Sequence, residues 1–117
     1  MKKILIADDA MFMRNALKVT LEKNGFEVIG TACDGREAVE KARALKPDLG
    51  TMDITMTELN GIEALKAIKE TNPEISVIML TAVSGDVAIR ECLENGADNF
   101  ILKPFSEDKL IEVISKE

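Results

Sequence analysis

Four short apolar runs of this chain each end at a residue that can bind a phosphate or a metal ion. Those residues are Asp8 with Asp9, Asp53, Thr81 and Lys103. A fifth apolar run, 28–32, ends without such a residue. In an open parallel sheet the carboxyl ends of the strands lie along one edge, where ligands bind. We therefore expect these residues, although distant in sequence, to lie in one pocket.

The apolar runs alternate with segments of helical periodicity, which predicts five strand–helix units. The expected strands are 3–7, 28–32, 49–52, 77–80 and 100–102. The expected helices are 11–24, 37–45, one from Asn60-Gly61 to Asn72-Pro73, 86–95, and one that follows Ser106 as N-cap. Strands that alternate with helices imply parallel pairing with right-handed crossovers. The sequence thus predicts a doubly wound parallel sheet with helices on both faces.

Length and charge narrow the classes of function. The 117 residues predict one domain, 1–117, and 15 basic against 21 acidic residues give a net charge of −6. A nucleic acid or an anionic membrane is therefore not the expected partner, whereas a cation is. No apolar stretch approaches the roughly 18 residues of a membrane span. Cys33 and Cys92 lack metal-site spacing, so we expect reduced thiols in a cytoplasmic protein.

Three carboxylates in one pocket predict a metal site. Asp8, Asp9 and Asp53 would repel one another unless a hard divalent cation with oxygen ligands bound between them. Mg2+ suits this arrangement because it needs few carboxylates and is usually completed by phosphate oxygens. In the alternative, Asp8 caps the following helix and Asp9 is solvated. The residues at the other strand ends favour the metal site.

The same pocket contains the groups needed for phosphoryl transfer. Asp53 would attack a phosphoryl group, and Lys103 would pair with Asp53 at rest and neutralise the transferring oxygens. Thr81 could donate a hydrogen bond to an anion. Pro104 would fix the following turn, through a cis or a trans bond. Because the chain has no histidine, the phosphoryl donor must be another molecule.

Four motifs, taken together, resemble the receiver domain of two-component response regulators over essentially the whole chain. They are Asp8-Asp9, Met52-Asp53, Thr81-Ala82 and Lys103-Pro104-Phe105. The resemblance implies a flavodoxin-like, five-stranded sheet in the order 2-1-3-4-5. It implies that Asp53 accepts phosphate from a histidine kinase and that Asp9, Asp53 and the backbone carbonyl of Thr55 bind Mg2+. Asp8 would act through water, and Thr81 and Lys103 would contact the phosphoryl group.

Residues 10–14 are similar to the corresponding segment of CheY-type chemotaxis regulators. This likeness implies a monomer, a CheA-like kinase, a flagellar motor switch protein as target, and a phosphatase. Phe100 matches the family's switch aromatic, which would rotate inward when Thr81 moves; in the alternative it only packs at the strand edge. The output surface would include Arg90, Glu91, Glu94 and Lys109.

The sequence departs from the family pattern at two positions. Thr57 replaces the usual proline, so the loop after Asp53 lacks one rigid φ angle and is expected to be more mobile. Gly50 replaces an apolar residue, at a cost of about 0.5–1 kcal/mol relative to alanine, and marks a close helix or is simply tolerated. Neither change removes a reacting group, so we expect activity to survive, with effects on stability and on how Thr55 presents its carbonyl.

Other classes of function fit parts of the sequence. A flavin-binding protein shares the fold, but this pocket is anionic and the chain has four Phe, no Trp and no Tyr. Phosphatases that form an aspartyl phosphate typically carry Asp-x-Asp, which Asp8-Asp9-Ala10 lacks. A receiver that serves a phosphorelay, or one separated from a DNA-binding output domain, remains the alternative to chemotaxis.

Overall fold

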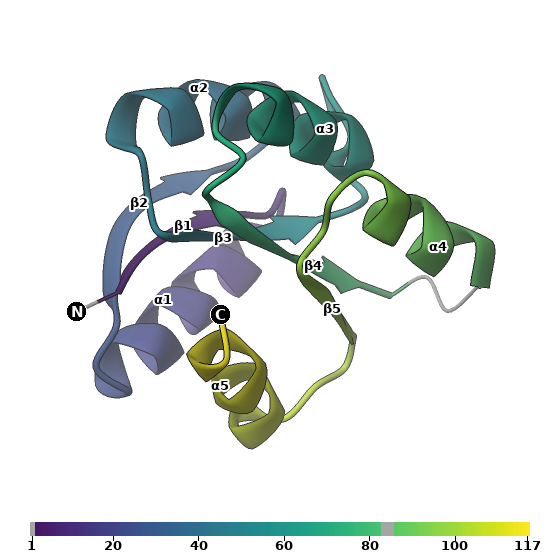
Figure 1. Ribbon diagram of the computed structural model, residues 1–117. Coiled ribbons are helices and arrows are strands. Elements are labelled where there is room, and N and C mark those ends of the chain that lie inside the picture. Colours follow the sequence, from purple (N-terminus) through teal and green to yellow (C-terminus); the bar gives the residue numbers. More distant parts are fainter. Residues whose placement is uncertain (1, 83–85) are drawn as a thin grey trace.

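The computed structural model describes residues 2–82 and 86–117, which form one five-stranded parallel sheet flanked by helices (Figure 1). The strands are β1 (Lys3–Ala7), β2 (Glu27–Ala32), β3 (Leu49–Asp53), β4 (Ser76–Thr81) and β5 (Asn99–Leu102). The helices are α1 (Met11–Lys23), α2 (Gly35–Leu45), α3 (Gly61–Thr71), α4 (Asp86–Glu94) and α5 (Glu107–Ser115). The strand order β2-β1-β3-β4-β5 confirms the predicted doubly wound fold. β2, which ends without a residue suited to binding phosphate or a metal ion, lies at the edge of the sheet.

Helices cover both faces of the sheet, with α2, α3 and α4 on one face and α1 and α5 on the other (Figure 1). Side chains of alternate strand residues point to opposite faces. Leu5 and Met79 therefore pack in the core beneath α2 and α3, whereas Ile6 and Leu80 pack against α1 and α5. Apolar side chains therefore cover both faces of the sheet, and the candidate site residues lie at the ends of the strands. No helix in the described ranges has the length and apolar character that crossing a membrane requires.

The main difference from the predicted boundaries is at α2, which begins at Gly35, two residues earlier than expected. Asp34 Oδ1 accepts a hydrogen bond of 2.8 Å from the Glu37 amide. Glu37 Oε1 in turn accepts one of 2.6 Å from the Cys33 amide. The Asp34 side chain thus caps α2, and Glu37 reaches back to the residue before this cap. Asp followed three positions later by Glu is a signal for the start of a helix that the sequence displays. The predicted caps Asn60 and Ser106 do begin α3 and α5.

Gly50 lies in the middle of β3, and of its two interpretations a close approach by a neighbouring helix is wrong, whereas simple tolerance fits the structure. A Cβ atom built on Gly50 would meet only the backbone oxygen of Leu5, at the ordinary contact distance of 3.8 Å. The residue is buried and its φ angle is not positive. Nothing around Gly50 therefore requires glycine.

We expect Gly50→Ala to stabilise the protein by roughly 0.5–1 kcal/mol, because alanine loses less backbone freedom on folding and its methyl group fits. The free energy of unfolding in urea measures this. Gly25 is the matched control, since open space surrounds it but its φ is +88°. Gly25→Ala should destabilise by about 1 kcal/mol. A Gly50→Ala protein less stable than wild type would show that β3 cannot accept the methyl group.

Candidate functional site

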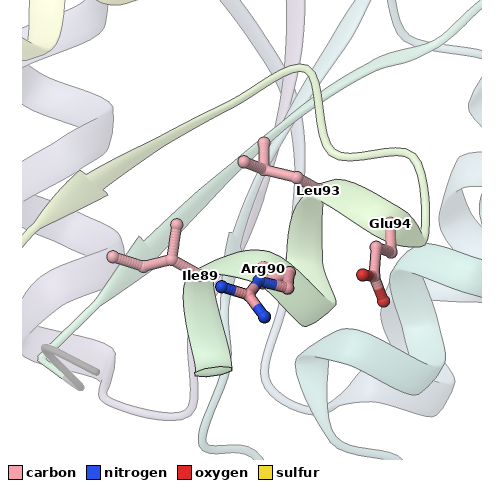
Figure 2. A pocket seen from close by; sticks show the side chains of 4 residues that line it. All are labelled: Ile89, Arg90, Leu93 and Glu94. Atoms are coloured by element: carbon pink, nitrogen blue, oxygen red, sulfur yellow. The ribbon is translucent and has the colours of Figure 1, made fainter. Parts of the chain in front are cut away.

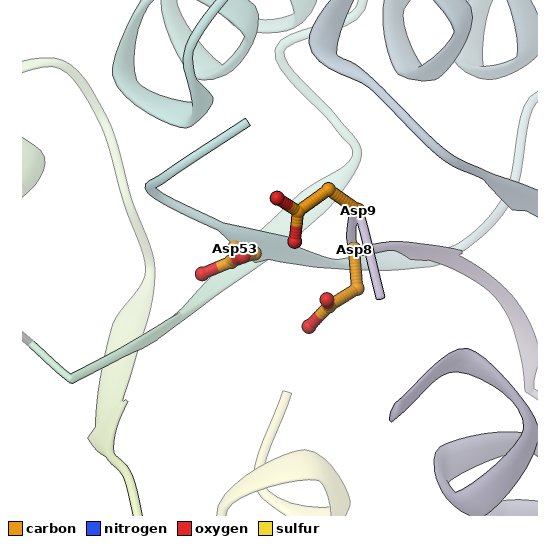
Figure 3. A group of neighbouring side chains, drawn as sticks. All are labelled: Asp8, Asp9 and Asp53. Carbon is orange, nitrogen blue, oxygen red and sulfur yellow. The ribbon is translucent and has the colours of Figure 1, made fainter. Parts of the chain in front are cut away.

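The three acidic residues singled out in the sequence meet at one edge of the sheet (Figure 3). Asp8 and Asp9 follow β1, and Asp53 is the last residue of the adjacent strand β3. Since Ala7 pairs with Met52, the register places the two strand ends side by side. One carboxylate oxygen from each aspartate lies within 4.8 Å of the others. The fold therefore concentrates three negative charges in a space that one cation could fill.

Asp8 is the most firmly held of the three. It is 1% exposed, and its Oδ1 accepts a hydrogen bond of 2.9 Å from the Ala10 amide. Its Oδ2 lies 3.1 Å from Lys103 Nζ. Its own amide donates to the Ala32 carbonyl at 3.0 Å, which ties the residue to the end of β2. Asp8 is not the N-cap of α1, a position occupied by Ala10, so it forms a fixed, buried wall of the site.

Lys103 contacts two of the carboxylates. Its Nζ lies 3.1 Å from Asp8 Oδ2 and 3.5 Å from Asp53 Oδ1, and its side chain is 19% exposed. Its amide donates to the Thr81 carbonyl at 2.7 Å, and the bond to Pro104 is cis. The sequence predicted the pair with Asp53 but not the shorter contact with Asp8. Which of two neighbouring carboxylates is closer depends on side-chain rotamers that no sequence motif encodes.

Asp53 combines burial with an acidic surrounding. Burial raises the pKa of its carboxyl above the ordinary value of 3.8, and the charges of Asp8 and Asp9 raise it further. The Lys103 ammonium acts in the opposite direction and lowers the pKa. A further positive charge near Asp53 would therefore favour the ionised form of its carboxyl group.

The other predicted residues lie around this cluster. Thr81 ends β4 and is 2% exposed. Thr55 is exposed in the loop that follows Asp53. Phe100 on β5 is half-buried and packs against the core beneath α2 and α3, as strand-edge packing would require. It also lines a surface hollow together with Leu102, Phe105 and other residues of β5 and α5.

Two glycines that the sequence analysis did not assign to the site shape the loop after Asp53. A Cβ at Gly61 would overlap the backbone carbonyl of Asp53, and one at Gly35 would overlap the carbonyl of Leu59. The Thr57 carbonyl accepts hydrogen bonds from Leu59 at 2.7 Å and from Gly35 at 3.5 Å. The loop is therefore packed against the first residues of α2 and α3. Its greater mobility, expected from the loss of proline, stays a prediction.

The donor set fits a hard divalent cation. All three groups are carboxylates, whose oxygens Mg2+ prefers, and a single ammonium contacts two of them. Asp9 is exposed, which leaves the site open to solvent and to a phosphate group. The arrangement can hold a cation beside the buried Asp53 carboxylate, with Lys103 as a second positive charge.

Comparison with known proteins assigns this arrangement to a family. The response regulator receiver domain family matches residues 4–115. The chain belongs to this family. CheY of Thermotoga maritima is 47% identical over 115 residues, 98% of this receiver and 96% of that protein. CheY of Bacillus subtilis is also 47% identical, over 97% of this receiver and 95% of that protein.

A solved structure supports the same assignment. The CheX–CheY–BeF3–Mg2+ complex of Borrelia burgdorferi contains a chain that matches this receiver with a TM-score of 0.95 and 35% identity. The match covers 98% of this receiver and 87% of that chain. The strand order and the five helices are thus those of solved receivers. The predicted family and fold are confirmed.

Proposed function

We propose that this receiver is a single-domain response regulator, with residues 1–117 as one domain, that accepts a phosphoryl group on Asp53 from a histidine kinase. It would work in the cytoplasm and carry chemotaxis signals, as the names of its 47% identical relatives suggest. One observation carries the proposal: a buried Asp53 lies beside two further carboxylates and an ammonium in a chain of the receiver family. Its direct partners would be a CheA-like kinase and a protein target.

The transfer itself would begin with attack by an ionised Asp53 oxygen on phosphorus. The new oxygen–phosphorus bond replaces the nitrogen–phosphorus bond of the donor's phosphohistidine, and the imidazole nitrogen keeps the bonding electron pair. Lys103 contacts Asp53 already and would follow the transferring oxygens, while the Thr81 hydroxyl would donate to one of them. Later attack by water on phosphorus would release inorganic phosphate and restore the carboxylate.

Asp9, Asp53 and the backbone carbonyl of Thr55 would hold Mg2+ directly, and Asp8 would contribute through water. When bound, Mg2+ supplies positive charge that offsets the negative charge of the phosphoryl oxygens. The protein itself must hold the carboxylate and carbonyl oxygens that would bind Mg2+ in place. Asp8 is fixed by its buried contacts, and Asp53 by its place at the end of β3.

Mg2+ is expected to raise the melting temperature of the wild type, because it binds the folded site and relieves repulsion between carboxylates. At 100 times its Kd the gain is about 2.7 kcal/mol. Asp9→Asn should raise the stability of the metal-free protein by roughly 0.5–1 kcal/mol, the range of a partly exposed charge interaction. The same variant should lose most of the Mg2+ effect. Thermal unfolding with MgCl2 and with EDTA measures both.

Asp108→Asn is the control for this experiment, because Asp108 is an exposed acidic residue in the first turn of α5, away from the cluster. Its melting temperature should respond to Mg2+ as the wild type does. A wild-type melting temperature indifferent to Mg2+, or an Asp9→Asn protein that responds fully, would contradict the metal site.

The output would pass through the surface of α4, β5 and α5. Figure 2 shows a hollow on α4 lined by Ile89, Arg90, Leu93 and Glu94, two of which were expected on this surface. Phe100, half-buried on β5, would turn inward when Thr81 moves toward the phosphoryl group. Phosphorylation would thereby alter binding to a flagellar motor switch protein. The complex of a CheY with CheX supports an expected phosphatase as a further partner.

Transfer from a phosphorylated chemotaxis histidine kinase tests this function. The radiolabelled kinase is mixed with the receiver and MgCl2, and both proteins are followed on a gel over time. We expect the label to leave the kinase and to enter the receiver within seconds to minutes, and EDTA to slow the transfer. A kinase that retains its label in the presence of this receiver, while passing it to a known CheY, would contradict the proposal.

A further inference from the structure

Arg14, on the first turns of α1, contacts the acidic site through the backbone. Its Nη1 donates a hydrogen bond of 2.8 Å to the carbonyl oxygen of Asp8. In the described part of the chain the guanidinium makes no ion pair with a carboxylate, although it contacts the backbone of Asp8, the residue that precedes Asp9. A cation this close to an acidic cluster, but bonded to a peptide oxygen, calls for an explanation other than charge pairing.

The bond restrains the backbone on one side of Asp9, and Asp8 restrains it on the other. The carbonyl held by Arg14 belongs to the peptide that precedes the Asp9 Cα atom. The Ala10 amide, which donates to Asp8 Oδ1 at 2.9 Å, belongs to the peptide that follows it. Because a peptide unit is planar, fixing both units fixes the two backbone dihedral angles of Asp9. The direction of its Cβ atom is thereby set.

The restraint on the backbone of Asp9 matters because, in the described part of the chain, no contact holds its carboxylate directly. It is exposed, and within residues 2–82 and 86–117 it makes no hydrogen bond or ion pair. Asp8 and Asp53, by contrast, are buried and contact Lys103. Of the three carboxylates, Asp9 therefore depends most on its backbone for its position.

We infer that Arg14 is a positioning residue for Mg2+, which orients Asp9 through the Asp8 carbonyl. The inference rests on the proposed function, since it takes Asp9 as a metal ligand. Charge and geometry predict opposite effects of Arg14. Its positive charge weakens the attraction of the site for Mg2+, whereas its hydrogen bond keeps a ligand in place. If Arg14 acts through its charge, removing it should strengthen Mg2+ binding. If it acts by positioning Asp9, removing it should weaken Mg2+ binding.

The test compares Arg14→Met with Lys18→Met. Lys18 is exposed on the next turn of α1, so Lys18→Met removes the same charge without touching the Asp8 carbonyl. The Kd for Mg2+ is measured from an NMR titration that follows the backbone amides of Asp9 and Ala10. We expect Arg14→Met to raise the Kd roughly tenfold, as the loss of an outer-shell partner does in other metal sites. Lys18→Met should leave the Kd unchanged or lower it.

Two further measurements separate positioning from a general loss of structure. Phosphorylation of Arg14→Met by acetyl phosphate should be slow at low Mg2+ and should reach the wild-type rate at saturating Mg2+. The Asp9 amide shift should differ from wild type before any Mg2+ is added. If Arg14→Met does not fold, Arg14→Lys against Lys18→Arg gives the same comparison, because lysine keeps the charge but loses the guanidinium fork.

An Arg14→Met protein that binds Mg2+ as tightly as wild type, or more tightly, would overturn the inference and leave Arg14 as a charge only. Equal loss of affinity in Arg14→Met and Lys18→Met would also overturn it. These outcomes differ from failure of the proposed function, in which the wild type itself shows no Mg2+-dependent shift at Asp9.

Discussion

Asp53→Asn is expected to abolish phosphorylation of the receiver by acetyl phosphate in the presence of Mg2+. An amide is a poor nucleophile, and the variant also removes one oxygen ligand of the proposed metal site. The neighbouring Asp8 cannot easily replace Asp53, because its two oxygens contact the Ala10 amide and Lys103. Intact-protein mass spectrometry should detect one added phosphoryl group on the wild type and none on the variant.

Asp108→Asn is again the matched control, since it makes the same chemical change at an exposed site on α5. It should gain the phosphoryl group as the wild type does. Acid-labile phosphate on Asp53→Asn would contradict the assignment of the acceptor. Mapping that phosphate to Asp9 would show that the exposed carboxylate can take over.

The convergence of the site was predictable because it follows from topology. Parallel strands end at one edge of the sheet, so the residues after β1 and β3 had to meet there whatever their side chains. Motif order then predicts separate roles for Asp53 and Lys103. The sequence also contains Asp34 followed three residues later by Glu37, a helix-start signal that places the start of α2 correctly.

Contacts that depend on three-dimensional detail were not predictable from the sequence. Gly61 reads as an ordinary first residue of a helix, but its lack of a side chain lets the Asp53 carbonyl pass close to it. Arg14 reads as a surface charge on α1, yet it donates to the Asp8 carbonyl. Both are contacts with backbone atoms, and a backbone atom leaves no residue-type signal in the sequence. The closer contact of Lys103 with Asp8 than with Asp53 depends instead on side-chain rotamers, which the sequence does not encode either.

Lys103→Met is expected to lower the stability of the metal-free protein by roughly 3 kcal/mol at neutral pH, because it leaves buried carboxylates without their cation. Asp8, whose side chain is 2% exposed, loses its ion pair, and Asp53 loses a contact of 3.5 Å. The rate of phosphorylation should fall about 100-fold, since a charge that stabilises the transferring oxygens is removed. Urea unfolding and acetyl phosphate assays measure the two effects.

The stability loss should depend on pH in a stated direction. The pKa of Asp53 is raised in the folded protein, chiefly by burial, and Lys103 is the group that limits the rise. Without Lys103 the folded state binds a proton on Asp53 more readily than the unfolded chain does, so stability increases as pH falls through the folded pKa. The deficit of Lys103→Met relative to wild type should therefore shrink as the pH is lowered from neutrality through the raised pKa of Asp53.

Lys69→Met provides the control for a lysine of similar exposure. The Lys69 side chain is 17% exposed, against 19% for Lys103, and its Nζ lies 2.8 Å from Asp98 Oδ2, far from the acidic cluster. This variant should also be less stable, but it should accept phosphate at the wild-type rate. A Lys103→Met protein with normal stability at neutral pH would mean that water or counterions already neutralise Asp8. A stability deficit that stays constant with pH would show that the unpaired charge of Asp53 does not cause it. Protonation of Asp53 at lower pH would otherwise remove that charge and reduce the deficit.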